Sequence, residues 1–177
     1  MYRSANYVLF VNYDDFESQI IENIRSQNEG SIYYSGYDCD SLALEPVSRF
    51  CEHFLHVFEM HPEAILEIRT KSTQVRCLLD RAPIPNCIIA MSFSSQESTQ
   101  RFEHKVPAIK NRIQTLKKLQ GMGWQIAIRF EPIIFEERLT ENYRLLFEEI
   151  FHSLDVSLLH SVSLGEFRMP KTYYKNI

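Results

Sequence analysis

The chain has 177 residues, of which 45% are hydrophobic and 24% charged; this composition excludes a disordered tail and suits one domain, residues 1–177, with a sizeable core. The formal net charge of −4 excludes a surface that is basic all over, as a purely electrostatic nucleic-acid binder would have. No stretch approaches the roughly 18 apolar residues of a membrane helix, and no signal-peptide pattern opens the chain, so we expect a cytoplasmic protein with reduced thiols.

One pattern repeats along the chain: a short apolar, β-branched run, then a polar loop, then an amphipathic helix. The runs predicted to be strands are 7–12, 31–36, 64–70, 86–93, 124–130 and 158–165. The stretches whose apolar spacing predicts helices are 14–27, 47–60, 73–80, 107–120 and 141–153. This alternation predicts parallel strands with right-handed crossovers, and two architectures fit it: an open doubly wound sheet or part of a (β/α) barrel.

The predicted helix 107–120 shows the two-sided pattern most clearly. Its apolar stripe consists of Ile109, Ile113, Leu116 and Leu119. The remaining positions include the basic residues Lys110, Arg112, Lys117 and Lys118. We interpret this basic side as a solvated outer face rather than as a nucleic-acid patch.

Polar residues follow the predicted strands at the end where α/β folds bind ligands. The segment "GYDCDS" follows run 31–36, and "RTKS" ends run 64–70. The single polar residues at the later strand ends are Lys71, Ser92, Ser94, Ser95, Glu131, Glu166 and Arg168. Together they carry both signs of charge, which predicts a site for a zwitterionic or polar small molecule.

No standard catalytic or metal motif is present: the chain has no GxGxxG, Walker A or GxSxG segment. The four cysteines form no CxxC or CxxxC pair, so the sequence predicts no metal site. Cys51, Cys77 and Cys87 lie in apolar or helical patterns and are interpreted as core residues, whereas Cys39 lies among polar residues. His53 and His56 are three residues apart on a predicted helix but have no third ligand at metal spacing.

Several segments occur in the order and spacing of a known family. They are "LFVNYDDF", "DCDSLALEPVS", "LEIRTKS", "IIAMSFSS", "RFEHKVPAIKNRIQTLKKLQGMGWQIAIRFEPII" and "SLGEFRMPK". With these segments nearly the whole chain resembles spore photoproduct lyase and its DNA repair photolyase-like relatives in the radical S-adenosylmethionine (SAM) superfamily. The resemblance implies a partial (β/α) barrel of parallel strands with outer helices, truncated here at the N-terminal strand.

The resemblance also implies a cofactor site. In the family, SAM lies across the strand ends and binds a four-iron four-sulfur cluster; its reductive cleavage yields a 5′-deoxyadenosyl radical that abstracts hydrogen from the substrate. Asp40 matches an aspartate of the loop that contacts SAM, and Cys39 stands where a serine is common. Lys71 matches a lysine that pairs with the SAM carboxylate, and Ser92 matches a serine that hydrogen-bonds SAM.

The chain departs from the family pattern at two points. It has no CxxxCxxC triplet, which in the family precedes the segment that matches residues 1–12. Tyr37 stands where spore photoproduct lyases have the cysteine that donates hydrogen to the substrate radical. We therefore expect the SAM-binding core of a lyase-like protein that is inactive alone, and the resemblance does not carry the thymine-dimer reaction over to this chain.

The sequence leaves two other hypotheses for the function open. One is a non-enzymatic half-barrel that binds a separately encoded chain carrying the cluster; the other is an unrelated doubly wound small-molecule binder. Nucleic acid is a partner implied by the resemblance, although the net charge does not support it. An exposed edge strand at residues 7–12 would favour self-association.

Overall fold

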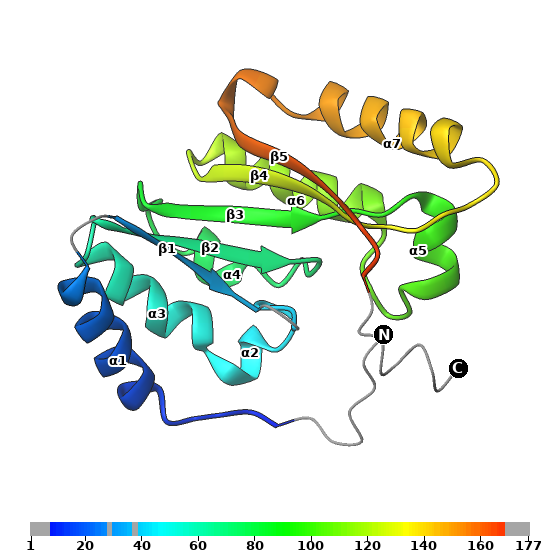
Figure 1. The fold of residues 1–177 in the computed structure, drawn as a ribbon. Coiled ribbons are helices and arrows are strands. Elements are labelled where there is room, and N and C mark those ends of the chain that lie inside the picture. The colour runs from blue at the N-terminus through cyan, green and yellow to red at the C-terminus, as the bar shows by residue number, and fades with distance from the viewer. Residues whose placement is uncertain (1–7, 28–29, 37–38, 169–177) are drawn as a thin grey trace.

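The computed structural model describes residues 8–27, 30–36 and 39–168, which form one sheet with helices (Figure 1). The strands are β1 (Ser31–Ser35), β2 (Ala64–Thr70), β3 (Cys87–Ser92), β4 (Gln125–Ile133) and β5 (Leu159–Glu166). They pair in the order β1-β2-β3-β4-β5, and every pair is parallel. Because the strand order follows the chain without reversal, the sheet is a half-barrel and not a doubly wound sheet. The prediction of a partial (β/α) barrel is confirmed.

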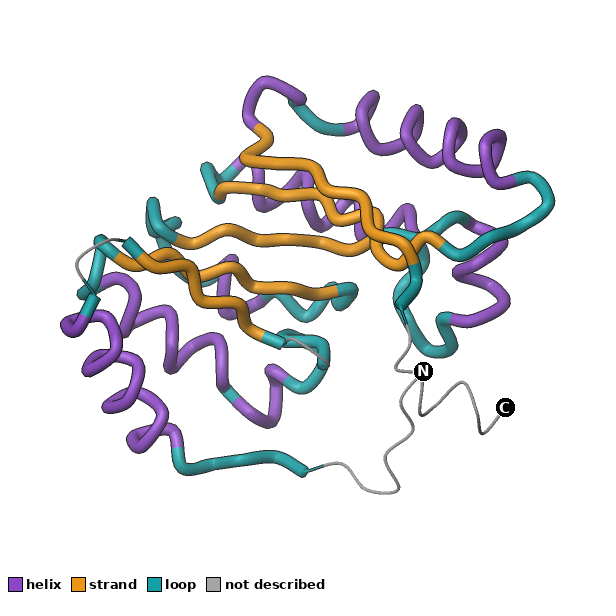
Figure 2. The backbone as a smooth tube through the Cα atoms, in the orientation of Figure 1, coloured by secondary structure: helices purple, strands orange, loops and turns teal. Residues whose placement is uncertain are grey.

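Helix α1 precedes β1, the other helices connect successive strands, and the helices pack mainly on one side of the sheet (Figures 1 and 2). They are α1 (Tyr13–Ser26), α2 (Glu45–Ser48), α3 (Phe50–Glu59), α4 (Arg76–Leu79), α5 (Gln96–Phe102), α6 (Ile109–Gly121) and α7 (Leu139–Ser153). The predicted helix 47–60 is in fact two helices, since Arg49 adopts a left-handed conformation with φ of 50° between α2 and α3. Helix α5 was not expected from the apolar spacing. No helix of the described residues has both the length and the apolar character needed to span a membrane.

The prediction of a first strand at residues 7–12 is wrong for the part that is described. Tyr7 lies outside the described residues, and residues 8–12 form no strand. The side chains of Val8, Leu9, Phe10 and Val11 are exposed, and no strand of the described chain pairs with this segment. The N-terminal edge of the described sheet is therefore β1, which pairs only with β2.

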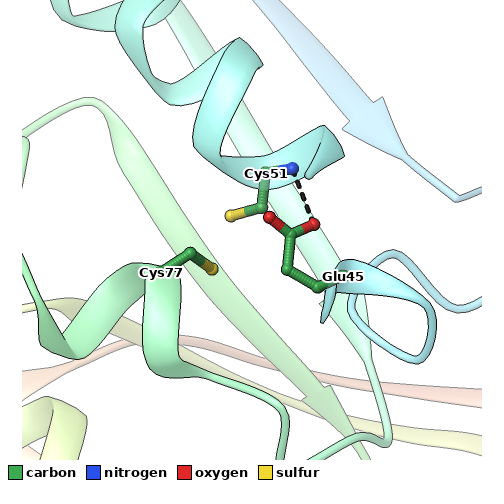
Figure 3. Close-up of side chains that lie close together, drawn as sticks. All are labelled: Glu45, Cys51 and Cys77. Carbon is green, nitrogen blue, oxygen red and sulfur yellow. Dashed lines mark hydrogen bonds between the residues drawn. The ribbon is translucent and has the colours of Figure 1, made fainter. Parts of the chain in front are cut away.

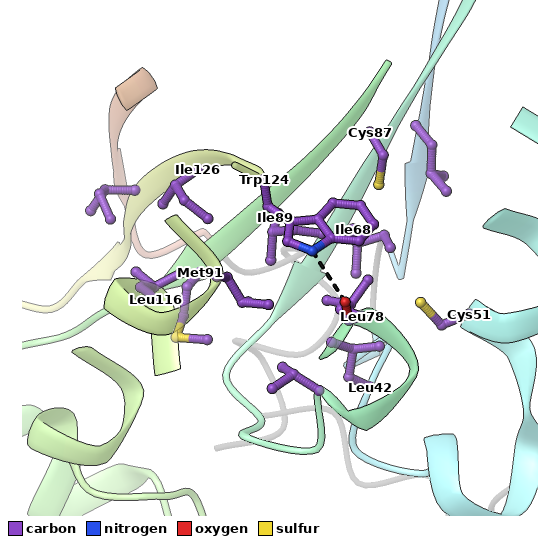
Figure 4. Packing of buried hydrophobic residues seen from close by; sticks show 14 of the residues in the cluster. Leu42, Cys51, Ile68, Leu78, Cys87, Ile89, Met91, Leu116, Trp124 and Ile126 are labelled. Carbon is purple, nitrogen blue, oxygen red and sulfur yellow. Dashed lines mark hydrogen bonds between the residues drawn. The ribbon is translucent and has the colours of Figure 1, made fainter. Parts of the chain in front are cut away.

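The main core lies between the sheet and the helices. Alternate strand residues such as Ile68, Ile89 and Ile126 are fully buried there against α3, α4 and α6. Figure 4 shows the centre of this packing, where the Trp124 indole Nε1–H donates a hydrogen bond to the Leu78 carbonyl at 3.2 Å. The predictions of Cys51 and Cys87 as core residues are confirmed, since both are buried within this cluster.

Helix α6 confirms its predicted apolar stripe and corrects its predicted polar face. Ile109, Ile113, Leu116 and Leu119 are all buried. Arg112, which we interpreted as solvated, is 0% exposed. Its charged head is buried because it has partners inside the protein, and these partners lie at the candidate site.

Candidate functional site

The loop after β1 is fastened to the end of β2 by the Asp40 side chain. Asp40 Oδ1 accepts hydrogen bonds from the backbone N–H groups of Leu42 at 3.0 Å and Ala43 at 2.9 Å, and from the Thr70 hydroxyl at 2.7 Å. Asp40 Oδ2 accepts one from the Lys71 backbone N–H at 2.6 Å. Oδ1 thus accepts three donors and Oδ2 accepts one, so Oδ2 keeps a lone pair for a further donor. Asp40 thus fixes the loop and the backbone of Lys71.

Lys71 lies just past β2, where its ammonium group meets a carboxylate from a distant part of the chain. Lys71 Nζ forms an ion pair with Glu103 Oε1, directly after α5, and donates a hydrogen bond to Ser94 Oγ at 3.5 Å. The Ser94 hydroxyl donates to the same Glu103 oxygen at 2.8 Å. The side chains of Lys71 and Glu103 are only 22% and 7% exposed, so the pair is largely withdrawn from water.

Arg112 reaches the same carboxylate from α6. Its Nη1 donates a hydrogen bond to the Ser92 carbonyl oxygen at 2.8 Å, and its Nη2 pairs with Glu103 Oε2 at 3.4 Å. The guanidinium carbon lies 5.2 Å from the centre of the Phe93 ring. Glu103 therefore bridges two cations, Lys71 and Arg112, and the second of these is tied to the end of β3.

The pKa values follow from this burial. Burial is the largest cause that acts on Lys71 and Arg112 and lowers the pKa of each, while Glu103 acts in the opposite direction. Burial also opposes ionisation of Glu103, but the charge of Lys71 and the hydrogen bonds from Lys71 and Ser94 outweigh it, so the pKa of Glu103 is lowered. Glu103 is thus held as a carboxylate between two buried cations.

Cys39 and Ser92 are the other two predicted site residues. Cys39 is exposed in the loop after β1. Ser92 ends β3 and is half-buried, and its hydroxyl has no hydrogen-bond partner within the part of the chain that is described. Tyr37 lies outside the described residues. The structure therefore brings Asp40, Lys71 and Ser92 to one rim, at the C-terminal ends of three neighbouring strands.

Ser95 and Glu131, two further polar residues of the predicted strand ends, form hydrogen bonds away from the Lys71 cluster. Ser95 accepts a hydrogen bond from the Ser98 N–H at 3.0 Å, which caps α5, and donates one to the buried Glu136 at 2.9 Å. Its role is structural. Glu131 accepts a hydrogen bond from Ser163 on β5 at 2.9 Å and so belongs to the other face of the sheet.

That other face, opposite the helices, carries a second ion-pair network. Glu67 Oε2 of β2 pairs with Arg129 Nη2 of β4 at 2.7 Å, and Glu67 Oε1 pairs with Arg69 Nε at 2.8 Å. The Arg69 guanidinium carbon lies 4.9 Å from the centre of the exposed Tyr34 ring. Burial opposes ionisation of Glu67, but Arg129 and Arg69 outweigh it and lower its pKa. The inner face of the half-barrel is thus charged and aromatic.

The sequence patterns do not identify Glu103, Arg112, Glu67 or Arg129 as members of these clusters. Arg112 carries a usable signal, because it lies three residues after Ile109 and falls on the buried side of α6. Glu67 also has one, since it alternates with apolar residues of a strand and must face away from them. Glu103 has none, because only the folded chain brings it to Lys71, 32 residues away.

The comparisons with known proteins agree with this fold. The chain superimposes on spore photoproduct lyase solved with bound AdoMet and dinucleoside spore photoproduct, with a TM-score of 0.87 and 21% identity over 94% of this chain and 50% of that one. A variant with dinucleoside spore photoproduct gives the same TM-score of 0.87 and 21% identity. A further complex of spore photoproduct lyase with this ligand gives a TM-score of 0.85 and 20% identity. The chain spans about half the length of these structures, and at this identity they show the fold.

Family membership comes from the sequence. No curated protein sequence matches the chain. The profile of the spore photoproduct lyase family, however, matches residues 4–173, nearly the whole chain. The half-barrel and this match together place the chain in the spore photoproduct lyase family.

Proposed function

We propose that the rim formed by the C-terminal ends of β1, β2 and β3 binds the amino-acid end of SAM, and that the chain is the SAM-binding core of a lyase-like radical SAM protein. The observation that carries this proposal is Lys71, a largely buried cation held at the strand ends by Glu103 and Ser94. A buried lysine at this rim offers a carboxylate a strong, charge-assisted hydrogen bond. One of the solved relatives holds AdoMet.

Each residue of the rim has its own role in the proposal. An ammonium group has three donors, and Glu103 and Ser94 take two from Lys71, which leaves one for the SAM carboxylate. The Ser92 hydroxyl supplies a further hydrogen bond. Asp40 positions Lys71 through its hydrogen bonds, and its Oδ2 keeps a lone pair for a donor group of SAM. Cys39 lines the loop next to the ligand.

The substrate proposed from family membership is a nucleic-acid lesion, since solved relatives hold the dinucleoside spore photoproduct. The inner face supports this class of substrate at one place. Tyr34 is 53% exposed there, and Arg69 lies over its ring. An exposed aromatic ring with a nearby arginine is a surface on which a base can stack.

The residues of this chain do not fit a four-iron four-sulfur cluster. Such clusters are held by thiolates that meet at one point. Among the described residues, the group of ligand atoms within 4.8 Å of one another that contains thiols has two of them, Cys51 and Cys77, with the carboxylate of Glu45. No step through a cluster is therefore assigned to this chain, and we propose that SAM cleavage requires a further polypeptide segment.

Titration of the purified chain with SAM tests the proposed function. We expect weak binding that is absent for 5′-methylthioadenosine, a compound that keeps the nucleoside but lacks the amino-acid end. Isothermal calorimetry measures both. Equal binding of the two compounds would show that the rim does not recognise the carboxylate, and a failure of SAM to bind would remove the proposed function.

Partner binding at the open edge of β1 is a second candidate function. A cavity of about 490 Å³ opens at this edge, between α1, α3 and β1. Its lining is mostly apolar and includes Phe16, Tyr33, Phe50, Phe54 and Phe58. Unpaired strand edges beside apolar surface favour pairing with another strand. A second chain, either a copy of this one or the cluster-bearing partner, would complete the barrel here.

Self-association through β1 is the testable form of this candidate. We expect the apparent mass in analytical ultracentrifugation to rise with protein concentration. Ile32→Lys, which places a charge on the edge strand, should reduce the association, whereas Val47→Lys on the exposed surface of α2 should not. A chain that stays monomeric at millimolar concentration would contradict association of copies at this edge.

A further inference from the structure

A carboxylate and two thiols meet inside the helix layer, where α2, α3 and α4 come together (Figure 3). Glu45 comes from α2, Cys51 from the first turn of α3 and Cys77 from α4. The three potential ligand atoms all lie within 4.8 Å of one another. Cys51 and Glu45 are 1% and 6% exposed, while Cys77 is half-buried and links the cluster to the surface. The cysteines are 26 residues apart, so no sequence motif announces this arrangement.

The Glu45 carboxylate is held in place by backbone donors. Its Oε2 accepts a hydrogen bond from the Cys51 N–H at 2.8 Å, and its Oε1 accepts one from the Glu52 N–H at 3.0 Å. Across the described chain, no lysine or arginine forms an ion pair with this buried carboxylate. Each oxygen keeps a further lone pair, and hydrogen bonds of this kind orient carboxylates that bind metals.

We propose that Glu45, Cys51 and Cys77 form a binding site for a zinc ion, with a water molecule as the fourth ligand. Zinc takes thiolate and carboxylate ligands in tetrahedral geometry, with Zn–S bonds of about 2.3 Å. Ligand atoms of such a site lie roughly 3.8 Å apart, so separations within 4.8 Å need only a small contraction. A divalent cation also neutralises a buried carboxylate that forms no ion pair with a lysine or arginine of the described chain.

Proton release gives the site a recognisable signature. The hydrogen bond to Cys77, followed by burial, raises the pKa of the Cys51 thiol. Zinc binds the thiolate form, so each thiol that coordinates it gives up its proton to the solvent. The apparent affinity then rises by about tenfold per pH unit for each proton that is displaced.

Metal titration of the full chain under reducing, anaerobic conditions tests the site. We expect one zinc ion per chain in competition with a chromogenic chelator, and a thiolate-to-cobalt charge-transfer band with Co²⁺. Cys51→Ser and Cys77→Ser should each weaken zinc binding by more than about a hundredfold. Loss of a residue that only hydrogen-bonds a metal ligand costs up to about a hundredfold, and loss of a ligand should cost more. Cys87→Ser is the matched control, since Cys87 is a buried thiol of β3 outside the cluster.

The proposal is overturned if the parent chain binds no stoichiometric zinc, or if both serine variants bind it like the parent. A Cys51–Cys77 disulfide that forms in the presence of zinc also overturns it. Should the serine variants fail to fold, the Co²⁺ spectrum of the parent decides, because absence of the charge-transfer band excludes thiolate ligation. The SAM titration is independent of every one of these outcomes.

Discussion

Replacing Arg112 by alanine should lower the free energy of unfolding by roughly 3 kcal/mol, the lower end of the cost of breaking a buried ion pair. Arg112 is 0% exposed, and its removal leaves the Ser92 carbonyl without its donor at 2.8 Å. The lower end is expected because Glu103 keeps Lys71 and Ser94 as partners. Urea denaturation at neutral pH, with an unchanged slope, measures the effect.

Lys110→Ala is the matched control, because Lys110 lies on the same helix two residues earlier and is exposed. It should change the free energy of unfolding by less than about 0.5 kcal/mol. Arg112→Lys should fall between the two, since a lysine keeps the charge but cannot reach two acceptors with a planar fork. A loss of less than about 1 kcal/mol in Arg112→Ala would contradict the buried ion pair and support a solvated side chain.

This variant also separates two placements of Arg112. A solvated outer face, as the alternation of charged residues in 107–120 suggests, predicts almost no effect. The structure predicts a large one. The two expectations differ because the burial of a helical residue depends on its spacing from the apolar stripe and on the partners that its side-chain tip contacts. Arg112 has the spacing of the stripe of Ile109, and its partners come from β3 and from the end of α5.

The strands of the sheet could be predicted from the sequence because each is a local apolar run, whereas the runs alone left their order open and the family resemblance implied it. The runs that became β2 and β3 have buried neighbours on both sides, so their composition reflects their final place. Residues 8–12 have the same composition but no neighbour in the described chain, and composition alone cannot supply one. The break between α2 and α3 could not be predicted from the sequence either, since a single left-handed residue, Arg49, divides two helical patterns.

The candidate site was predictable in position but not in its chemistry. Asp40, Lys71 and Ser92 follow strands, and parallel strand ends must lie at one rim. The partners of these residues depend on tertiary contacts. Glu103 reaches Lys71 only because α5 returns the chain to the rim, and Cys51 meets Cys77 only because α3 and α4 pack together. Asp40, assigned to the ligand from sequence order, also accepts hydrogen bonds from the Thr70 hydroxyl and the Lys71 N–H, which the sequence could not show.

Lys71→Ala should lower the affinity for SAM by about tenfold or more, because a charged hydrogen bond contributes about 1.5–3 kcal/mol. The effect should be confined to ligands that carry a carboxylate: S-adenosylhomocysteine should lose affinity like SAM, and any residual binding of 5′-methylthioadenosine should not change. Lys117→Ala, which removes an exposed positive charge from α6, controls for the loss of net charge. Calorimetry with the three ligands measures these differences.

Glu103→Gln should change the affinity for SAM in the opposite direction. The substitution keeps the shape of the side chain but removes the charge that competes for Lys71. A ligand carboxylate then meets a lysine without an ionic partner, so the affinity for SAM should rise while that of Lys71→Ala falls. If Lys71 contacts the ligand only indirectly, through the position of the loop, both variants should weaken binding. Equal affinity of the parent chain and Lys71→Ala for SAM would show that this rim does not bind the carboxylate.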